Sequence, residues 1–169
     1  MSVTEVFANE MEREAINTRK MLECIPTEKF GWKPHEKSMD LLQLATHIAV
    51  LAGRVATIVT SKHLDFASHP GRKIEITTTH DLIKLHDEGV RKSIEALRNA
   101  GDDMLLEPFT LKNGDHIIFE LPKEIALRSN GMNHLYHHRA QLGVYLRLLD
   151  VPIPGMYELS ADDRLKAKK

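Results

Sequence analysis

The chain has 169 residues, of which 42% are apolar and 28% charged, and 23 basic against 24 acidic residues give a formal net charge of −1. This composition is typical of a soluble globular protein, and the length suits a single domain over residues 1–169. The balanced charge lacks the electrostatic footprint of a nucleic-acid-binding protein, so we expect no nucleic-acid partner.

Cysteine use and the N-terminus indicate the compartment. Cys24 is the only cysteine, which excludes an internal disulfide framework and fits a reducing environment. The first residues carry acids where a signal peptide needs an apolar core, and we find no stretch that approaches the roughly 20 apolar residues of a membrane span. The sequence therefore predicts a cytoplasmic protein with no membrane partner.

Helical periodicity predicts three helices before residue 102. Each begins with a side chain that can accept a hydrogen bond from the first turn, and Ser2 and Glu5 have the spacing of a capping box. The segment 61–78 loses periodicity and is expected to be a loop. The predicted bounds are Ser2 to Pro26 for the first helix, Ser38 or Asp40 to Thr60 for the second, and Thr78 or Thr79 to Gly101 for the third.

A β-hairpin and a fourth helix complete the predicted fold. Asn113-Gly114 lies between two apolar runs and predicts a type I′ turn, which needs positive φ at both positions. The fourth helix covers roughly Lys123–Leu149. Together these elements predict an all-α protein, a four-helix bundle with a small β-hairpin insertion between helices 3 and 4.

Three of the ten histidines fall inside one five-residue span, 134–138, of the predicted fourth helix. His134 and His138 are one turn apart, so both imidazoles can reach one metal ion. His137 is also about one turn from His134, so two pairs compete. An apolar stripe through Leu135 and Leu142 includes His138, which favours His134 and His138 as the inward pair and places His137 at the rim.

His47 is a candidate for the third ligand because it lies in the most apolar part of the second helix. A lone buried histidine is more often simply hydrogen-bonded, and that interpretation stays open. Two helices that each bring inward histidines favour a metal site in a bundle core. Three neutral imidazoles suit zinc, nickel, copper or iron and leave a coordination position for water or substrate.

Three blocks of the chain resemble the DinB/YfiT-like superfamily. They are Thr46-His47-Ile48-Ala49, the run NHLYHHRAQ at 133–141, and the segment 145–157 with YLRLL and VPIPGMY. The resemblance covers nearly the whole chain. It implies a four-helix bundle with a three-histidine divalent-metal site, often zinc or nickel, and frequent homodimers; the implied ligands are His47, His134 and His138. Ala140 replaces a usual Gly, and Glu158-Leu159 replace a common Gly-Pro, which leaves the conformation of the tail open.

Neighbouring residues receive weaker assignments. Gln141 is expected to hydrogen-bond the imidazole of His138 and fix its orientation. Arg139 either contacts an anionic group or forms a structural salt bridge with an acid such as Asp162. Tyr136 and Tyr145 either line a cavity or belong to the core. The remaining histidines are expected at the surface: His35, His63, His69, His80, His86 and His116.

The resemblance implies a metal-dependent transferase that binds a low-molecular-weight thiol and activates it for attack on an electrophile, since a divalent cation deprotonates a coordinated thiol. One alternative is a hydrolase that uses metal-bound water. The histidines here have no adjacent acid of the kind found in H-E-x-x-H, and this counts against hydrolysis. Another is a non-catalytic, stress-related metal or small-molecule binding protein. Enzyme status therefore stays open. Apolar Val55, Ile58 and Val59 also suggest a homodimer.

Overall fold

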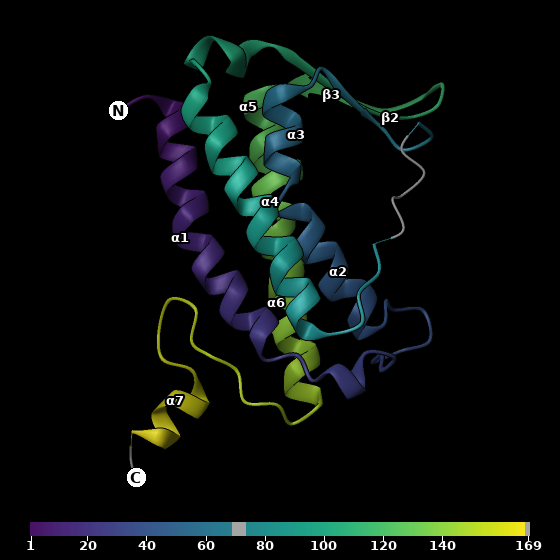
Figure 1. The fold of residues 1–169 in the computed structure, drawn as a ribbon, viewed down its shortest axis with the longest axis vertical. Helices are drawn as coiled ribbons and strands as arrows, with labels where there is room; N and C mark the ends of the chain where they lie inside the picture. The colour runs from purple at the N-terminus through teal and green to yellow at the C-terminus, as the bar shows by residue number, and fades with distance from the viewer. Residues whose placement is uncertain (69–73, 168–169) are drawn as a thin grey trace.

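The computed structural model describes residues 1–68 and 74–167. The fold is mostly helical, with a small three-stranded sheet at one end (Figure 1). The α-helices are α1 (Val3–Glu23), α2 (Leu41–Leu51), α3 (Arg54–Thr60), α4 (Thr79–Asn99), α5 (Lys123–Ala126), α6 (His134–Leu148) and α7 (Ala161–Lys166). The other elements are the 3₁₀ turns η1 (Thr27–Lys29) and η2 (Asp102–Leu106), the π-helical segment η3 (Leu127–Asn133), and strands β1 (His63–Asp65), β2 (Pro108–Asn113) and β3 (His116–Pro122).

The helices begin at the predicted capping residues. The backbone N–H of Gln43 donates to Asp40 Oδ1 at 2.7 Å, and the backbone N–H of Asp40 donates to Gln43 Oε1 at 3.0 Å. Thr78 starts α4 with the same reciprocal pattern. At Ser2 half of the predicted capping box forms, since Ser2 Oγ accepts from the backbone of Glu5 at 3.2 Å without a return bond among the described residues.

The predicted second helix is interrupted at Gly53, which separates α2 from α3. Helix α4 passes so close that a Cβ on Gly89 would lie 2.7 Å from the backbone nitrogen of Gly53. Ser93 of α4 donates to the carbonyl of Ala52 at 2.7 Å and accepts from the N–H of Ala56 at 3.1 Å. Ser93 therefore satisfies backbone groups that the interruption would leave unpaired.

The last long helical region also differs from a single regular helix. The π-helical η3 joins α5 to α6 and ends immediately before His134. Such segments are rare and frequently accompany functional sites. Helix α6 ends in a Schellman motif, in which Val151 donates to the carbonyl of Leu146 at 3.0 Å and Asp150 adopts a φ of 57°.

Strands β2 and β3 form the predicted hairpin, but the prediction of a type I′ turn was wrong. Asn113 pairs with His116 within the ladder, so Gly114 and Asp115 form the loop. Gly114 has a φ of 60°, while Asn113 and Asp115 have none in the positive range, which is the φ pattern of a type II′ turn. Strand β1, which the loss of periodicity after residue 61 did not predict, pairs in parallel with β2.

The stretch Leu41–Thr60 is long and apolar enough to cross a membrane by composition, with a mean hydropathy of 1.5. The expectation that no stretch approaches that size was therefore wrong here. Half of this stretch is buried inside the protein, as in the core helix of a soluble protein. Val55, Ile58 and Val59, which suggested a dimer contact, belong to this core with exposures of 1%, 0% and 7%, so they supply no reason for dimerisation.

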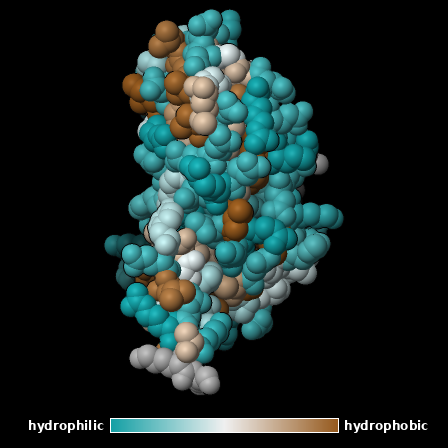
Figure 2. Space-filling model, turned by 90° about the vertical axis from the view of Figure 1, so that its left-hand side faces the viewer, coloured by the Kyte–Doolittle hydropathy of each residue, from teal (hydrophilic) through white to brown (hydrophobic). Residues whose placement is uncertain are grey.

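Helix α1 presents its outer face to solvent. Figure 2 shows this side of the molecule, where most residues are hydrophilic and hydrophobic ones gather near the end that carries the N-terminus. The exposed apolar side chains of α1 are Val3, Val6 and Ile16, whereas Phe7 and Met11 are buried. The amphipathic pattern of α1 thus directs one side into the core.

Candidate metal centre

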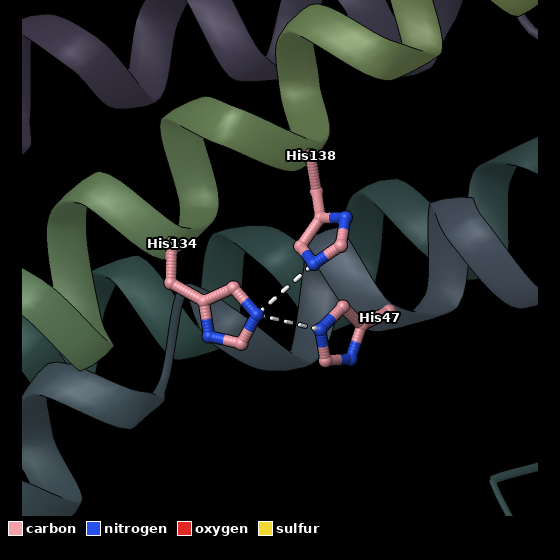
Figure 3. A group of neighbouring side chains, drawn as sticks. All are labelled: His47, His134 and His138. Atoms are coloured by element: carbon pink, nitrogen blue, oxygen red, sulfur yellow. Dashed lines mark hydrogen bonds between the residues drawn. The ribbon is translucent and has the colours of Figure 1, made fainter.

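The structure brings together the three histidines that the sequence singled out. His47 comes from α2, and His134 and His138 come from the first two turns of α6. Their rings face one another across the interface between the two helices (Figure 3). One ligand atom from each lies within 4.8 Å of the others. His134 Nε2 is 3.3 Å from His47 Nε2 and 3.0 Å from His138 Nε2.

Two of the three separations between the ligand nitrogens match those of a tetrahedral metal site. Nitrogens about 2.0–2.1 Å from one zinc ion at tetrahedral angles lie about 3.3 Å from each other. The distances of 3.3 Å and 3.0 Å between the ring nitrogens are close to this value. The group can therefore hold one divalent ion through three imidazoles.

Hydrogen bonds to residues outside the cluster orient two of the three rings. His138 Nδ1 lies 2.7 Å from Gln141 Oε1, which as a carbonyl oxygen only accepts, so Nδ1 carries the proton. The His134 ring bonds the backbone of Asn130, and this bond favours the charged form, as donation to a carbonyl does. The Nε2 atoms of the two rings lie 3.0 Å apart. The predicted hydrogen bond between Gln141 and His138 is confirmed.

Burial favours the neutral form of His47 and His134. It is the largest cause that lowers the pKa of His47 to about 4, followed by the charges of His138, His134 and Arg54. Burial is also the first cause that lowers the pKa of His134. Metal ligation requires unprotonated imidazoles, so the site is prepared for a cation at neutral pH.

His137 lies outside this group. Its side chain is exposed, and its ring packs edge-on against His138 with centroids 5.0 Å apart. The apolar stripe along the helix favoured the pair His134 and His138, and these are the two histidines that lie in the group with His47.

Arg139 forms a structural salt bridge, the second of its two predicted roles, but its partner is Glu14 and not Asp162. Its side chain is buried, and Nη2 lies 2.7 Å from Glu14 Oε2 and 2.8 Å from the hydroxyl of Tyr157. Asp162 instead pairs with Arg147 at 2.5 Å. With Glu14 as its partner, Arg139 ties α1 to α6.

Arg139 also borders a pocket of about 610 Å³ between α1, α6 and the C-terminal segment. The lining includes Met21, Tyr136 and Tyr157 but none of the three clustered histidines. Tyr136 therefore lines this separate pocket. Tyr145 packs edge-on against Trp32 with ring centroids 5.6 Å apart, as a core aromatic does.

Two residues in or near the core escaped the sequence analysis. His86, expected at the surface, is 1% exposed on α4, with Nδ1 3.0 Å from Asp87 Oδ1 and, within the described part of the chain, no hydrogen-bond partner for Nε2. Arg54 is half-buried and acts electrostatically on both His47 and His134. The other histidines assigned to the surface, His35, His63, His80 and His116, are exposed, and His69 lies outside the described residues.

The fold and site together define a mainly helical protein with a three-histidine candidate metal centre. The DinB family model matches residues 1–166, and the chain belongs to the DinB family. The structure is similar to that of a DinB-like protein (YjoA) from Bacillus subtilis, with a TM-score of 0.68 and 20% identity over 89% of this chain and 96% of that one. A DinB-like protein from Bacillus cereus ATCC 10987 gives a TM-score of 0.65 and 23% identity over 89% and 95%. No curated protein matches the chain.

Proposed function

We propose that His47, His134 and His138 bind one divalent metal ion, zinc or nickel, and that the protein is a metal-dependent transferase acting through a low-molecular-weight thiol. The observation that carries the proposal is the meeting of three imidazoles from two helices, with His134 Nε2 3.3 Å from His47 Nε2 and 3.0 Å from His138 Nε2. Three imidazole ligands suit either metal and leave a coordination position for a small molecule.

The chemistry of transfer needs a thiolate at neutral pH, and a divalent ion bound at this site would supply it by lowering the pKa of a coordinated thiol. The protein's own groups hold the site in order. Gln141 fixes the tautomer of His138, and the backbone of Asn130 orients His134. Burial of His47 keeps its imidazole unprotonated. In the transfer step the sulfur forms a bond to an electrophilic carbon, and the leaving group departs with its electron pair.

The charges around the rings favour transfer over hydrolysis. Among the described residues, the charged groups that act most strongly on the pKa values of His47 and His134, in either direction, are other histidines and Arg54, and no carboxylate is one of them. Hydrolysis by metal-bound water usually recruits such a carboxylate as a general base. Arg54 instead makes the surroundings positive, which favours an anionic ligand.

Metal analysis tests the first part of the proposal. The untagged protein, purified without chelator, should contain about one zinc or nickel per chain, and His47→Ala and His138→Ala should each lose it because three ligands become two. His137→Ala is the matched control, an exposed histidine on the same helix, and should keep its metal. Full loss of metal in His137→Ala would contradict the assignment of ligands.

An activity panel tests the second part. The metal-loaded protein is assayed with several small thiols and a chromogenic electrophile, beside ester and amide substrates. Transfer to the electrophile that is lost in His47→Ala supports the thiol transferase. Ester or amide turnover alone would identify a metal-dependent hydrolase. Stoichiometric metal with neither activity would favour the non-catalytic binding protein.

A further inference from the structure

Arg54 and Asn130 form the next contact beside the histidine cluster along the same helix interface. Asn130 precedes His134 by four residues, about one helical turn, and Arg54 follows His47 by seven residues, about two turns. Arg54 Nη1 donates to Asn130 Oδ1 at 3.1 Å. The ring of His134 bonds the backbone of Asn130, so this contact lies directly beside the cluster.

The backbones are held at a fixed distance at this level. A Cβ on Gly131 would lie 3.1 Å from Val55 Cγ2, so η3 and α3 are in direct contact beside the arginine. The His134 ring also bonds the backbone of Asn130. Asn130 therefore links the position of Arg54 to the position of a candidate metal ligand.

The guanidinium of Arg54 is partly desolvated and has no acidic partner among residues 1–68 and 74–167. It is half-buried, burial lowers its pKa, and its contacts are the neutral amide of Asn130 and the ring of Phe66 at 5.8 Å. Among the residues that the structure describes, the ion pairs include Arg139 with Glu14 but none with Arg54. An unpaired, partly buried cation costs free energy, which a bound anion would recover.

We propose that Arg54, oriented by Asn130, binds the carboxylate of a small thiol whose sulfur occupies the open metal position. This inference rests on the proposed function, because it names the ligand class of the same site. A guanidinium has five donors, and the bond to Asn130 uses one of them. The remaining donors match the two oxygens of a carboxylate, which a lysine ammonium cannot match in the same fork geometry.

The test uses the protein loaded with cobalt(II), in which thiolate coordination produces a charge-transfer absorption. Two probes of equal reach are titrated, 3-mercaptopropionate and its uncharged methyl ester. The wild type should bind the acid at least about tenfold more tightly than the ester, and the preference should shrink as ionic strength rises. Arg54→Gln should bind both probes alike while keeping its cobalt, since Arg54 is not a metal ligand.

Two further variants separate charge from fold. Arg54→Lys keeps the charge and should retain part of the preference. Arg91→Gln is the matched control, because Arg91 is an exposed arginine on α4 paired with Glu88, and should behave like the wild type. Absorption with both probes at equal affinity in the wild type overturns the Arg54 site alone. Failure to load cobalt, or loading without absorption from either thiol, overturns the proposed function and this inference with it.

Discussion

Gln141 controls which nitrogen of His138 is free. Its Oε1 accepts from Nδ1 at 2.7 Å, so replacing it by leucine removes the bond that selects the tautomer and orients the ring. We expect Gln141→Leu to weaken zinc binding about 10- to 100-fold, the usual cost of losing such a partner. Competition titration against a chromophoric chelator measures the change. An affinity equal to that of the wild type would show that the bond does not support the site.

His86 gives the protein a sensitivity to acid. Burial lowers its pKa in the folded state, and the Asp87 carboxylate only partly offsets this effect. The unfolded chain titrates near the ordinary pKa of about 6.5, so below that pH the unfolded state binds more protons. The free energy of unfolding of the metal-free protein should therefore fall as the pH drops below about 6.5 and stay level above it, as far as His86 is concerned.

The variant His86→Leu isolates this contribution. It loses the bond to Asp87 but also removes the unpaired Nε2, so we expect its stability near pH 7.5 to stay within about 1 kcal/mol of the wild type. Its loss of stability between about pH 7.5 and 5.5 should be smaller, because the group that takes up the proton is gone. Urea unfolding at the two pH values checks this. An equal loss in both proteins would place the acid sensitivity elsewhere.

Sequence patterns identified His134 and His138 because the geometry of one helix brings them together, whereas His47 was found from its apolar surroundings. Spacing along one helix brings His134 and His138 together, and the same logic places Gln141 beside His138. The position of Arg54 beside the cluster was missed because its contact with Asn130 joins residues that are 76 positions apart in the sequence. His86 was missed because its neighbours Asp87 and Glu88 are polar, whereas its burial is set by how the helices pack.

Among the elements, α4 closely approaches the junction between α3 and α2, the helix that carries His47. Gly89→Ala would place a Cβ 2.7 Å from Gly53 N and 3.1 Å from the carbonyl carbon of Ala52. Backbone atoms cannot move aside cheaply, so we expect a loss of about 1–3 kcal/mol in the free energy of unfolding, measured in urea. Gly101→Ala is the control, since its Cβ meets nothing within 4 Å, and it should be close to neutral. Equal stabilities would contradict this packing.

Helix starts were predictable, while interruptions were not. Asp40 and Thr78 act through hydrogen bonds within one turn, so the sequence around each start contains the signal. The interruption at Gly53 depends on Ser93 of another helix. Strand β1 has three residues and pairs with residues 110–112, a partner that periodicity in its own neighbourhood cannot reveal.

At the scale of the whole molecule, a metal ion would join α2 to α6. A ligand that binds only the folded state raises stability by about 2.7 kcal/mol at a free concentration 100 times its dissociation constant. We expect zinc or nickel to raise the melting temperature of the protein in a concentration-dependent way. The same titration should leave His138→Ala nearly unchanged, and an equal rise in that variant would indicate binding elsewhere on the chain.

Homodimer formation stays a prediction of the family resemblance. The buried positions of Val55, Ile58 and Val59 remove the residue-level reason for it. Val144 and Leu148 on the outer side of α6 are each 59% exposed, so apolar surface is present on another helix. Sedimentation velocity decides between monomer and dimer.

X-ray absorption at the metal edge of the zinc- or nickel-loaded protein tests the central claim most directly. The spectrum reports both the bond lengths and the number of imidazoles around the ion. We predict three imidazole nitrogens at about 2.0–2.1 Å in the wild type, one from each of His47, His134 and His138, and two in His47→Ala if any metal remains. A first shell without imidazole scattering, or a spectrum that His47→Ala leaves unchanged, would contradict the account.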